Sequence, residues 1–420
     1  MARSAERTEE GDRSSRARDA AVGVLRTLRE NGHTAYFAGG CVRDELLGLL
    51  PQDYDIATDA RPERVRALFK RTDFVGASFG VVLVKTEGFI VEVATFRSDG
   101  PYSDKRRPDY VEFSNAQGDA MRRDFTVNAL FLDPTEAIGA EGIRGEVIDY
   151  VNGLADLRAG VIRAVGLAGA RLNEDHLRAL RAVRFAARLG FEVEAETAKA
   201  VAGDAANLAG VSRERVGVEV RKMLAHPTRG RAVDLLTSLG LLRAVFGVEQ
   251  SGDSGDPLSR VAGDAQTALA AVALLPGAGD DDESRIAVIR DSLCLSNEES
   301  DALTRCSAVL RLLPRWDRLS VAKQKRLAAS GGYEPAMAIT EVREFALADH
   351  IRRGVVELSR TPSGIKPVPI LTGSDLIASG LRPGPEFRFL LESVYDAQLE
   401  GRVVNMESAM ELVRSLRVRE

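Results

Sequence analysis

The spacing of apolar residues changes its period near Gly153, and this change limits what the chain can fold into. Before that point, short apolar runs at residues 35–38, 80–85 and 88–96 lie between turns, which is typical of strands. After it, apolar residues recur every three to four positions, which favours helices. The sequence therefore predicts an α/β head with a mixed sheet, roughly 150 residues long, followed by all-α units.

Length and further breaks in the pattern divide the chain into segments. A single hydrophobic core rarely supports 420 residues, so several structural units are expected. The predicted segments are a disordered leader at 1–18, the head at 19–153, and helical segments at 154–224, 225–359 and 360–420. A first helix is predicted at 16–31, overlapping the end of the leader. Residues 98–121 are polar and weakly periodic, which predicts a long loop with one strand at 110–113.

Charge is distributed unevenly along the chain. The net charge of −5 is unlike that of a generic nucleic-acid-binding protein. Residues 158–188 nevertheless carry seven arginines against two acidic residues, and residues 210–231 carry six basic against two acidic residues. Such basic stripes are able to hold RNA, and solvated helix faces produce the same pattern.

Composition excludes several other classes of protein. The three cysteines and four histidines are scattered without metal-ligand spacing, so neither a disulfide framework nor a zinc site is expected. No stretch approaches the ~20 apolar residues that span a bilayer, and the N-terminus lacks the apolar core of a signal peptide. We therefore expect a cytoplasmic protein without membrane contact.

Three carboxylates form the first candidate site. Asp53 and Asp55 stand at the start of a strand predicted at 52–57, and alternation places both on one face. Carboxylates so placed are able to share two divalent cations, which would activate a 3′-hydroxyl and neutralise a leaving pyrophosphate. Glu92 interrupts an apolar strand, and since a buried carboxylate is costly without a cation, it is a candidate third ligand. An isolated Asp-x-Asp is also common in turns and caps.

A glycine pair precedes these aspartates. Gly39 and Gly40 follow the predicted strand at 35–38 and open a short helix, whose first N–H groups are free to bind an anion. Glycine lets the backbone approach a phosphate, and the guanidinium of Arg43 adds a forked cation. The strand, the glycine turn and the paired carboxylates together predict a site for phosphate and metal.

These motifs resemble those of one enzyme family. The first motif of the class II tRNA nucleotidyltransferase and bacterial poly(A) polymerase family is similar to residues 39–48 together with Asp53 and Asp55. Four further resemblances follow in family order, at residues 122–130, 152–163, 174–185 and 212–222. Together they cover residues 36–224, a little under half of the chain.

The resemblance implies an organisation, a cofactor and a set of contacts. The helical segments at 154–224, 225–359 and 360–420 would be the neck, body and tail, and the enzyme would use Mg²⁺, CTP, ATP and the 3′ acceptor end of tRNA. Asp53 and Asp55 match the magnesium ligands. The positions matched to nucleotide binding are Gly39, Gly40, Arg43, Arg123, Asp124, Asn128, Asp175, Arg178, Arg181 and Arg184. The function implied is the template-independent addition of CCA to tRNA.

Asp175 and Arg178 suit a choice between bases. They are three residues apart on a predicted helix and would be neighbours on one face, one accepting and one donating hydrogen bonds. Cytosine and adenine each present an amino donor beside a ring acceptor. Uracil and guanine present the reverse polarity, which would cost roughly 1–3 kcal/mol for each unpaired group. By the helical period Arg184 points nearly opposite Asp175, so we expect it to support the neck or a phosphate.

Other functions stay open at this stage. A poly(A) polymerase shares every catalytic motif, although the end of the chain at 414–420 is short and mixed in charge rather than strongly basic. A partial enzyme that adds only CC or only A is a further alternative, with the loop at 98–121 expected to take part in that choice. A non-catalytic RNA-binding protein would not need Asp53, Asp55 and Arg123, and a small-molecule nucleotidyltransferase would not need a basic neck.

Overall fold

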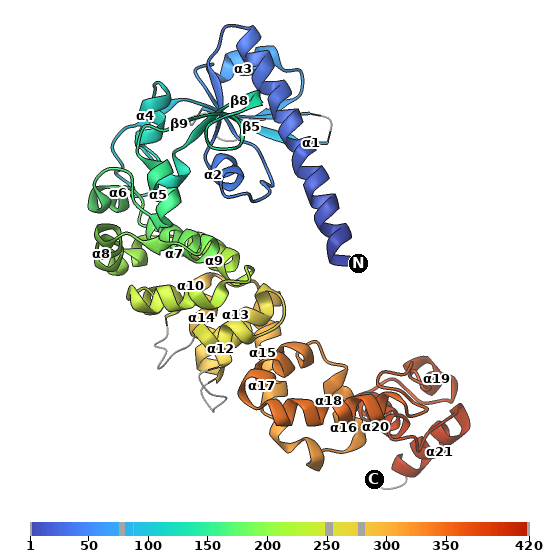
Figure 1. Cartoon of the computed structure of the whole chain (residues 1–420). Coiled ribbons are helices and arrows are strands. Elements are labelled where there is room, and N and C mark those ends of the chain that lie inside the picture. Colours follow the sequence, from blue (N-terminus) through green and yellow to red (C-terminus); the bar gives the residue numbers. More distant parts are fainter. Residues whose placement is uncertain (1, 75–79, 87, 248–254, 276–281, 418–420) are drawn as a thin grey trace. The chain divides into compact units, whose positions relative to one another are not determined.

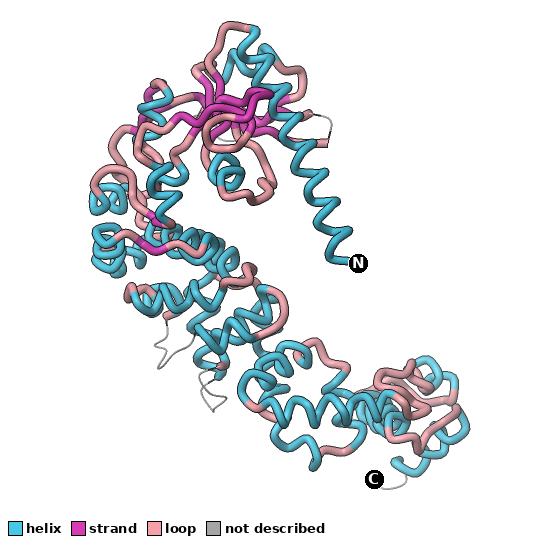
Figure 2. Tube along the Cα trace, viewed as in Figure 1, coloured by secondary structure: helices cyan, strands magenta, loops and turns pink. Residues whose placement is uncertain are grey.

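The computed structural model describes residues 2–74, 80–86, 88–247, 255–275 and 282–417 (Figure 1). The chain divides into two compact units. The first consists of Met1–Glu219 and Leu235–Ala244, and the second of Val220–Asp234 and Val245–Glu420. Every strand that the structure describes belongs to the first unit, and the second is helical (Figure 2). The predicted fold, a mixed-sheet head followed by helical units, is confirmed.

The strands have short, regular bounds. They are β1 (Ala35–Ala38), β2 (Ile56–Thr58), β3 (Thr72–Phe74), β4 (Val81–Lys85), β5 (Ile90–Thr95), β6 (Arg97–Asp99), β7 (Val111–Phe113), β8 (Phe131–Ile138), β9 (Arg144–Ile148), β10 (Val161–Ile162) and β11 (Glu192–Val193). Seven of them form one sheet in the order β3-β4-β5-β2-β1-β8-β9. In it β2 runs parallel to β5 and antiparallel to β1. The pairs β6–β7 and β10–β11 stand apart from this sheet.

Helices surround this sheet and build the rest of the first unit. They are α1 (Ala2–Glu30), α2 (Gly40–Leu46), α3 (Pro62–Leu68), α4 (Ala116–Met121), the 3₁₀ helix η2 (Thr126–Asn128), α5 (Gly153–Ala159), α6 (Ala168–Glu174), α7 (Leu177–Leu189), α8 (Ala195–Gly203) and the 3₁₀ helix η3 (Ala205–Gly210). Next come α9 (Arg213–Leu224), α10 (Arg229–Ser238) and α11 (Leu242–Phe246), which cross the boundaries between the units. An aromatic cluster on the sheet, with Phe96 and Phe131 buried beside Ala38, forms part of the core.

The second unit is a series of packed helices. They are α12 (Gly255–Arg260), α13 (Ala265–Leu274), α14 (Asp282–Leu293), α15 (Asn297–Leu310), the 3₁₀ helix η4 (Leu313–Arg318), α16 (Val321–Ala328), α17 (Tyr333–Arg343), α18 (Phe345–Ser359), α19 (Gly373–Ala378), α20 (Glu386–Leu399) and α21 (Met406–Arg417). Lys325 on α16 is buried, and its Nζ donates to Thr361 Oγ1 at 2.7 Å, Ser363 Oγ at 2.7 Å and the Leu399 carbonyl at 2.9 Å. The ammonium thereby joins α16 to the segment after α18 and to the end of α20.

The prediction of a disordered leader at 1–18 is wrong. Helix α1 begins at Ala2 and runs without a break through the predicted first helix. The Ser14 hydroxyl donates to the Pro51 carbonyl at 2.8 Å, Ala17 is buried, and Arg18 Nε donates to Glu45 at 3.0 Å. These contacts tie a polar stretch to the head, and they involve partners that local sequence does not reveal.

The predicted loop at 98–121 is largely ordered. Its ends form the antiparallel pair β6–β7, with Ser98 opposite Glu112, and the helix α4 follows. The strand predicted at 110–113 is confirmed as β7, and the irregular part shrinks to the residues between β6 and β7. The strand predicted at 52–57 begins only at Ile56, so Asp53 and Asp55 precede it.

Close packing fixes the segment at the end of the head. A Cβ at Gly153 would stand 2.3 Å from the Thr126 carbonyl oxygen, so only glycine fits there. The Thr126 hydroxyl donates to Asp156 at 2.7 Å, and Arg163 Nε donates to the same carboxylate at 3.1 Å. Residues 152–163 therefore pack directly against η2. The finer division of the chain into head, neck, body and tail stays a prediction.

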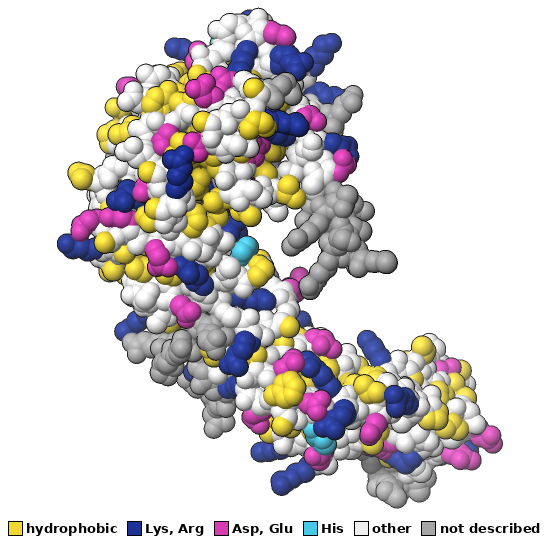
Figure 3. Space-filling view, in the orientation of Figure 1, with side chains coloured by type: hydrophobic (Ala, Val, Ile, Leu, Met, Phe, Trp, Pro, Cys, Tyr) yellow, Lys and Arg dark blue, Asp and Glu magenta, His cyan; other side chains and the backbone are white. Residues whose placement is uncertain are grey.

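The arginines of the stripe at 158–188 are paired within the protein. Each of the seven forms an ion pair with an acidic side chain. The pairs are Arg158–Glu141, Arg163–Asp156, Arg171–Glu174, Arg178–Glu174, Arg181–Asp124, Arg184–Glu219 and Arg188–Asp44. On the face drawn in Figure 3, basic and acidic side chains are interspersed. Five of the seven pairs use acidic residues from outside the stripe, so acids from elsewhere in the fold compensate much of the net positive charge counted along the sequence.

Within the described residues, no helix is long and apolar enough to cross a bilayer. The cytoplasmic location stays a prediction.

Candidate active site

Asp53 and Asp55 lie where the parallel strands β2 and β5 begin. Tyr54 and Ile56 are buried, so the alternation predicted for this stretch holds although the strand starts later. The Asp55 carbonyl accepts from Ala38 N at 3.0 Å, which places Asp55 beside the end of β1. Because Ile56 pairs with Val93 in parallel register, Asp55 stands level with Glu92. Two carboxylates from the segment before β2 and one from β5 therefore lie near the same end of these neighbouring strands.

Burial and neighbouring charges raise the pKa values of two of these carboxylates. Burial and the charges of Glu92 and Asp53 raise the pKa of Asp55 to about 7, against a smaller lowering by Arg123. The pKa of Glu92 is also raised, by partial desolvation and by Asp53. The premise that Glu92 is buried is wrong, because its side chain is on the exposed side of β5 while Val91 and Val93 are buried. Its proximity to the aspartates is what makes it a candidate.

The donor set fits a divalent cation bound by few protein ligands. No group of three or more acidic, histidine or cysteine side chains among the described residues forms a ready-made metal site. Magnesium does not need one, because it keeps several waters and takes only one or two carboxylates from a protein. Asp53 and Asp55 supply such a pair, and a cation between them would relieve the repulsion that raises the pKa of Asp55.

The Arg123 side chain lies against the glycine turn at Gly39 and Gly40. Gly39 has φ 78° and ψ −124°, a conformation open only to glycine, and a Cβ there would stand 2.8 Å from Arg123 Nη1. Arg123 is held in this place by Asp119, whose Oδ2 accepts from Nε at 3.1 Å and from Nη2 at 3.0 Å. The guanidinium therefore lies over the turn and close enough to lower the pKa values of Asp55 and Glu92.

Arg43 does not occupy the position expected for a phosphate ligand. It is buried, and its guanidinium donates to Asp44 Oδ1 at 2.8 Å and to Asn128 Oδ1. Asn128 Nδ2 donates in turn to Asp124 at 3.1 Å, and Asp124 accepts from Arg181 Nε at 2.8 Å. These five residues form a continuous buried chain from the glycine turn to α7, which we call the internal relay. The expectation that Arg43 presents its fork to a phosphate is not met in this structure.

Asp124 is the most strongly stabilised anion of the relay. Burial alone would raise its pKa, but the charge of Arg181 and hydrogen bonds from Asn128, Arg181 and the Phe125 amide lower it to about 2. The carboxylate is therefore ionised at any physiological pH. Asp124 binds both Asn128 and Arg181, and the contact of these three residues with nucleotide stays a prediction.

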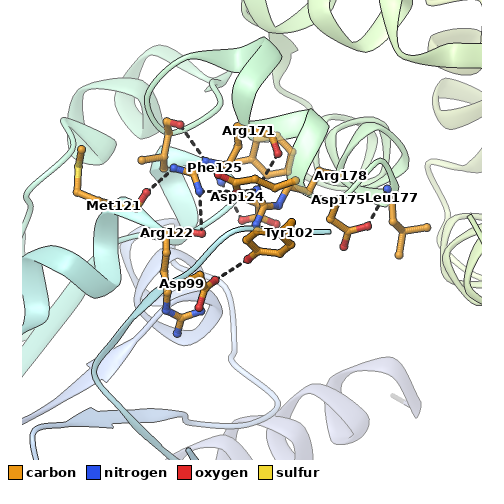
Figure 4. A network of polar contacts seen from close by, with 12 residues as sticks. Asp99, Tyr102, Met121, Arg122, Asp124, Phe125, Arg171, Asp175, Leu177 and Arg178 are labelled. Atoms are coloured by element: carbon orange, nitrogen blue, oxygen red, sulfur yellow. Dashed lines mark hydrogen bonds and ion pairs between the residues drawn. The ribbon is translucent and has the colours of Figure 1, made fainter. Parts of the chain in front are cut away.

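Asp175 and Arg178 are not on one helix as predicted. Asp175 has an extended conformation between α6 and α7, and only Arg178 belongs to α7. Arg178 Nη1 donates to the Arg171 carbonyl at 2.7 Å and pairs with Glu174. Asp175 Oδ1 accepts from the Leu177 amide at 3.1 Å. Both residues lie near the start of α7 (Figure 4), and the Arg178 amide donates to the Asp175 carbonyl at 3.0 Å, so the two residues remain neighbours along the backbone.

Tyr102, from the segment predicted as a loop at 98–121, lies beside Arg178. The Arg178 guanidinium lies 5.9 Å from the centre of the Tyr102 ring, and the Tyr102 hydroxyl donates to Asp99 at 2.5 Å (Figure 4). Lys105 Nζ also donates to Asn173 at 3.0 Å. The segment between β6 and β7 therefore reaches the region of Asp175 and Arg178, as expected of a segment that takes part in nucleotide choice.

Arg184 takes the supporting role expected of it. Its Nε donates to Glu219 on α9 at 2.5 Å, and its guanidinium lies 4.2 Å from the centre of the Phe185 ring. The same ring contacts Arg43 and Arg181 at 5.2 and 5.3 Å.

Sequence reasoning missed several residues of the site. Asp119 was not singled out, and Glu174, Phe185 and Arg215 were given no role although they lie inside the motifs at 174–185 and 212–222; all four contact candidate ligands. A signal existed for Asp119, which stands four residues before Arg123, and for Glu174, four before Arg178.

Comparison with known proteins places the chain in a family. Residues 35–163 match the poly(A) polymerase head domain, and residues 190–248 match a domain described as a probable RNA- and SrmB-binding site of polymerase A. The CCA-adding enzyme of Lactobacillus gasseri is 33% identical over 396 residues, which cover 93% of this chain and 95% of that enzyme. The chain belongs to the family of CCA-adding enzymes and poly(A) polymerases.

Other members of the family match the chain in part or in fold. The CCA-adding enzyme of Geobacillus thermodenitrificans is 43% identical over 234 residues, 56% of either chain, so the chain matches only about half the length of several curated relatives. The crystal structure of the Bacillus stearothermophilus CCA-adding enzyme in complex with CTP has a TM-score of 0.71 and 30% identity, and the match covers 96% of this chain and 98% of that one. Nucleotidyltransferases of this family generally use divalent metal ions.

Proposed function

We propose that this protein adds C, C and A to the 3′ end of tRNA from CTP and ATP, with Mg²⁺ as its metal. The observation that carries the proposal is the gathering of Asp53, Asp55 and Glu92 beside the glycine turn, with Arg123 lying over that turn. Relatives named as CCA-adding enzymes, one of them matched over nearly its whole length, support the substrate.

Different residues of the chain would serve the metal and the triphosphate. Asp53 and Asp55 would hold the metal, which when bound supplies the positive charge for activating a 3′-hydroxyl and neutralising pyrophosphate. Asp55 with a pKa of about 7 is ready to exchange a proton for a cation near neutral pH. Arg123 would neutralise part of the triphosphate, and the absence of a Cβ at Gly39 leaves the room that its guanidinium occupies beside the turn.

The base would be chosen at the other end of the site. Asp175 accepts and Arg178 donates, and this polarity suits the amino and ring-nitrogen edge of cytosine and adenine. Uracil and guanine reverse the polarity, so the wrong nucleotide leaves polar groups unpaired. One acceptor–donor pair would then serve both CTP and ATP.

The test uses tRNA transcripts that end before the first C, after one C and after CC, each with labelled CTP or ATP and Mg²⁺. The expected result is stepwise addition that completes CCA and stops. Long A tails without incorporation of C would identify a poly(A) polymerase, which the match to a poly(A) polymerase head domain makes the chief rival. Addition that halts at CC, or begins only at CC, would identify a partial enzyme, and no incorporation would refute the proposal.

A further inference from the structure

We infer that Arg215 sets the base specificity by fixing the orientation of the Asp175 carboxylate, an inference that rests on the proposed function. Arg215 lies on α9, 40 residues after Asp175, and its Nη2 donates to Asp175 Oδ2 at 2.6 Å. Its side chain and that of Asp175 are both largely withdrawn from solvent, at 22% and 15% exposure. The ion pair is therefore partly shielded, and it is stronger than a surface pair of the same length.

The two oxygens of Asp175 are held by different partners. Oδ1 accepts from the Leu177 amide at 3.1 Å, and Oδ2 accepts from Arg215. An ionised carboxylate has about four acceptor positions, so two are used for holding it and two are left for a ligand. With both oxygens anchored, the group is not free to rotate away from a base that offers the wrong partner.

Because the Asp175 carboxylate is anchored, it is able to discriminate between bases. A carboxylate that is fixed repels the carbonyl oxygen of uracil or guanine, whereas a mobile carboxylate turns aside and lets that oxygen be hydrated. Discrimination by a polar site depends on leaving the wrong ligand's groups unpaired. Arg215 touches neither metal nor triphosphate in this account, and we class it as a positioning residue.

The base-reading arginine is held in a similar way by another residue. Arg178 pairs with Glu174 and donates to the Arg171 carbonyl. The partners of Arg178 both lie on α6, whereas the side-chain partner of Asp175 lies on α9. Arg215 therefore connects base reading to a helix that carries no other candidate base-reading residue among those named above.

The experiment compares Arg215→Met and Arg215→Lys with the wild type in single-nucleotide incorporation. The readouts are the kcat/KM ratios of CTP over UTP on tRNA lacking its end and of ATP over GTP on tRNA ending in CC. Arg215→Met is expected to lower both ratios about tenfold or more. Lysine keeps one donor and the charge, so Arg215→Lys should recover most of the selectivity. Each ratio is measured within one preparation, so a partly unfolded sample does not change it.

Arg213→Met is the matched control. Arg213 is on the same helix, and its Nη1 donates to the Ala244 carbonyl at 3.3 Å, away from Asp175. Its ratios should stay within about twofold of the wild type. If Arg215→Met slowed all four nucleotides equally and kept both ratios, Arg215 would be only structural and the inference would be refuted. A wild type that incorporates neither C nor A would refute the proposed function instead.

Discussion

The two ends of the candidate site differ in how their charges are satisfied. At the end of the site proposed to bind metal, burial and neighbouring carboxylates raise the pKa values of Asp55 and Glu92, and the positive charge of Arg123 only partly offsets this. At the base end, Asp175 and Arg178 are each held by hydrogen bonds and an ion pair. We therefore expect the end with the carboxylates to gain free energy when a cation binds, whereas the side chains proposed to read the base are already held in place without a ligand. The predictions below test this contrast.

The largest effect is expected from removing a metal ligand. Asp53→Asn and Asp55→Asn should each lower kcat by about a thousandfold or more, because the charge that a metal ion supplies in the transition state is lost. The measurement is single-turnover incorporation of CTP with Mg²⁺. Asp73→Asn, on a surface ion pair with Lys85, is the control and should change the rate little. Normal turnover in a folded Asp53 or Asp55 variant would contradict the metal assignment.

The contrast also predicts an unusual pH dependence of stability. The pKa of Asp55 is raised from 3.8 to about 7, so the folded state binds a proton that the unfolded state has already lost. Without metal, stability should therefore fall as the pH rises from about 4 to about 7, on the order of 1.4 kcal/mol per pH unit from this group. Thermal unfolding of the metal-free protein across this range measures it.

Two controls accompany this measurement. Asp55→Asn removes the titrating group and should flatten the profile between the two pKa values. Addition of Mg²⁺ at pH 7.5 should restore stability to the wild type and not to Asp55→Asn, because the ion binds the folded state. If the stability of the metal-free wild type rose between pH 4 and pH 7, the raised pKa of Asp55 would be contradicted.

A smaller effect is expected from the base end. Arg178→Ala should lower the preference for CTP over UTP by roughly 1–3 kcal/mol, since the donor that pairs with the cytosine ring nitrogen is lost. Arg123→Ala is the contrasting variant and should weaken all nucleotides alike, because phosphate carries no base information. If the two variants gave the same selectivity ratios, the division of the site into two ends would be wrong.

The smallest effect is expected from the exposed arginines of the stripe. Arg158 pairs with Glu141 and is 65% exposed, so Arg158→Gln should change the free energy of unfolding by under about 1 kcal/mol. Its effect on tRNA binding is the sharper measurement. A slope of log Kd against log salt that is reduced by about one would show that Arg158 contacts a phosphate in spite of its partner.

Local patterns predicted the parts of the site that depend on local geometry. Alternation placed Tyr54 and Ile56 in the core, and the glycine pair marked a turn that only glycine at position 39 is able to form. The patterns did not predict contacts between residues that are far apart in the sequence. Arg43 fits a phosphate site by type, but it binds Asn128, which is 85 positions away.

The same reason explains the errors in the fold. Residues 1–18 are polar and resemble a disordered leader, yet Ser14 meets Pro51 and Arg18 meets Glu45. Asp175 was expected on a helix because the three-residue spacing to Arg178 is helical, but its side chain accepts from the Leu177 amide at the start of α7 instead. A short acidic side chain next to a helix start often takes this role, and the spacing alone does not distinguish it.

The buried ammonium of Lys325 has a mechanical consequence. Its three protons are all taken up, two by the hydroxyls of Thr361 and Ser363 and one by the Leu399 carbonyl. If residues 361–363 moved away from α16, the buried Lys325 ammonium would lose two hydrogen bonds, at a cost of several kcal/mol. We therefore expect residues 361–363 to stay attached to α16 and to the end of α20 rather than to form a hinge between them.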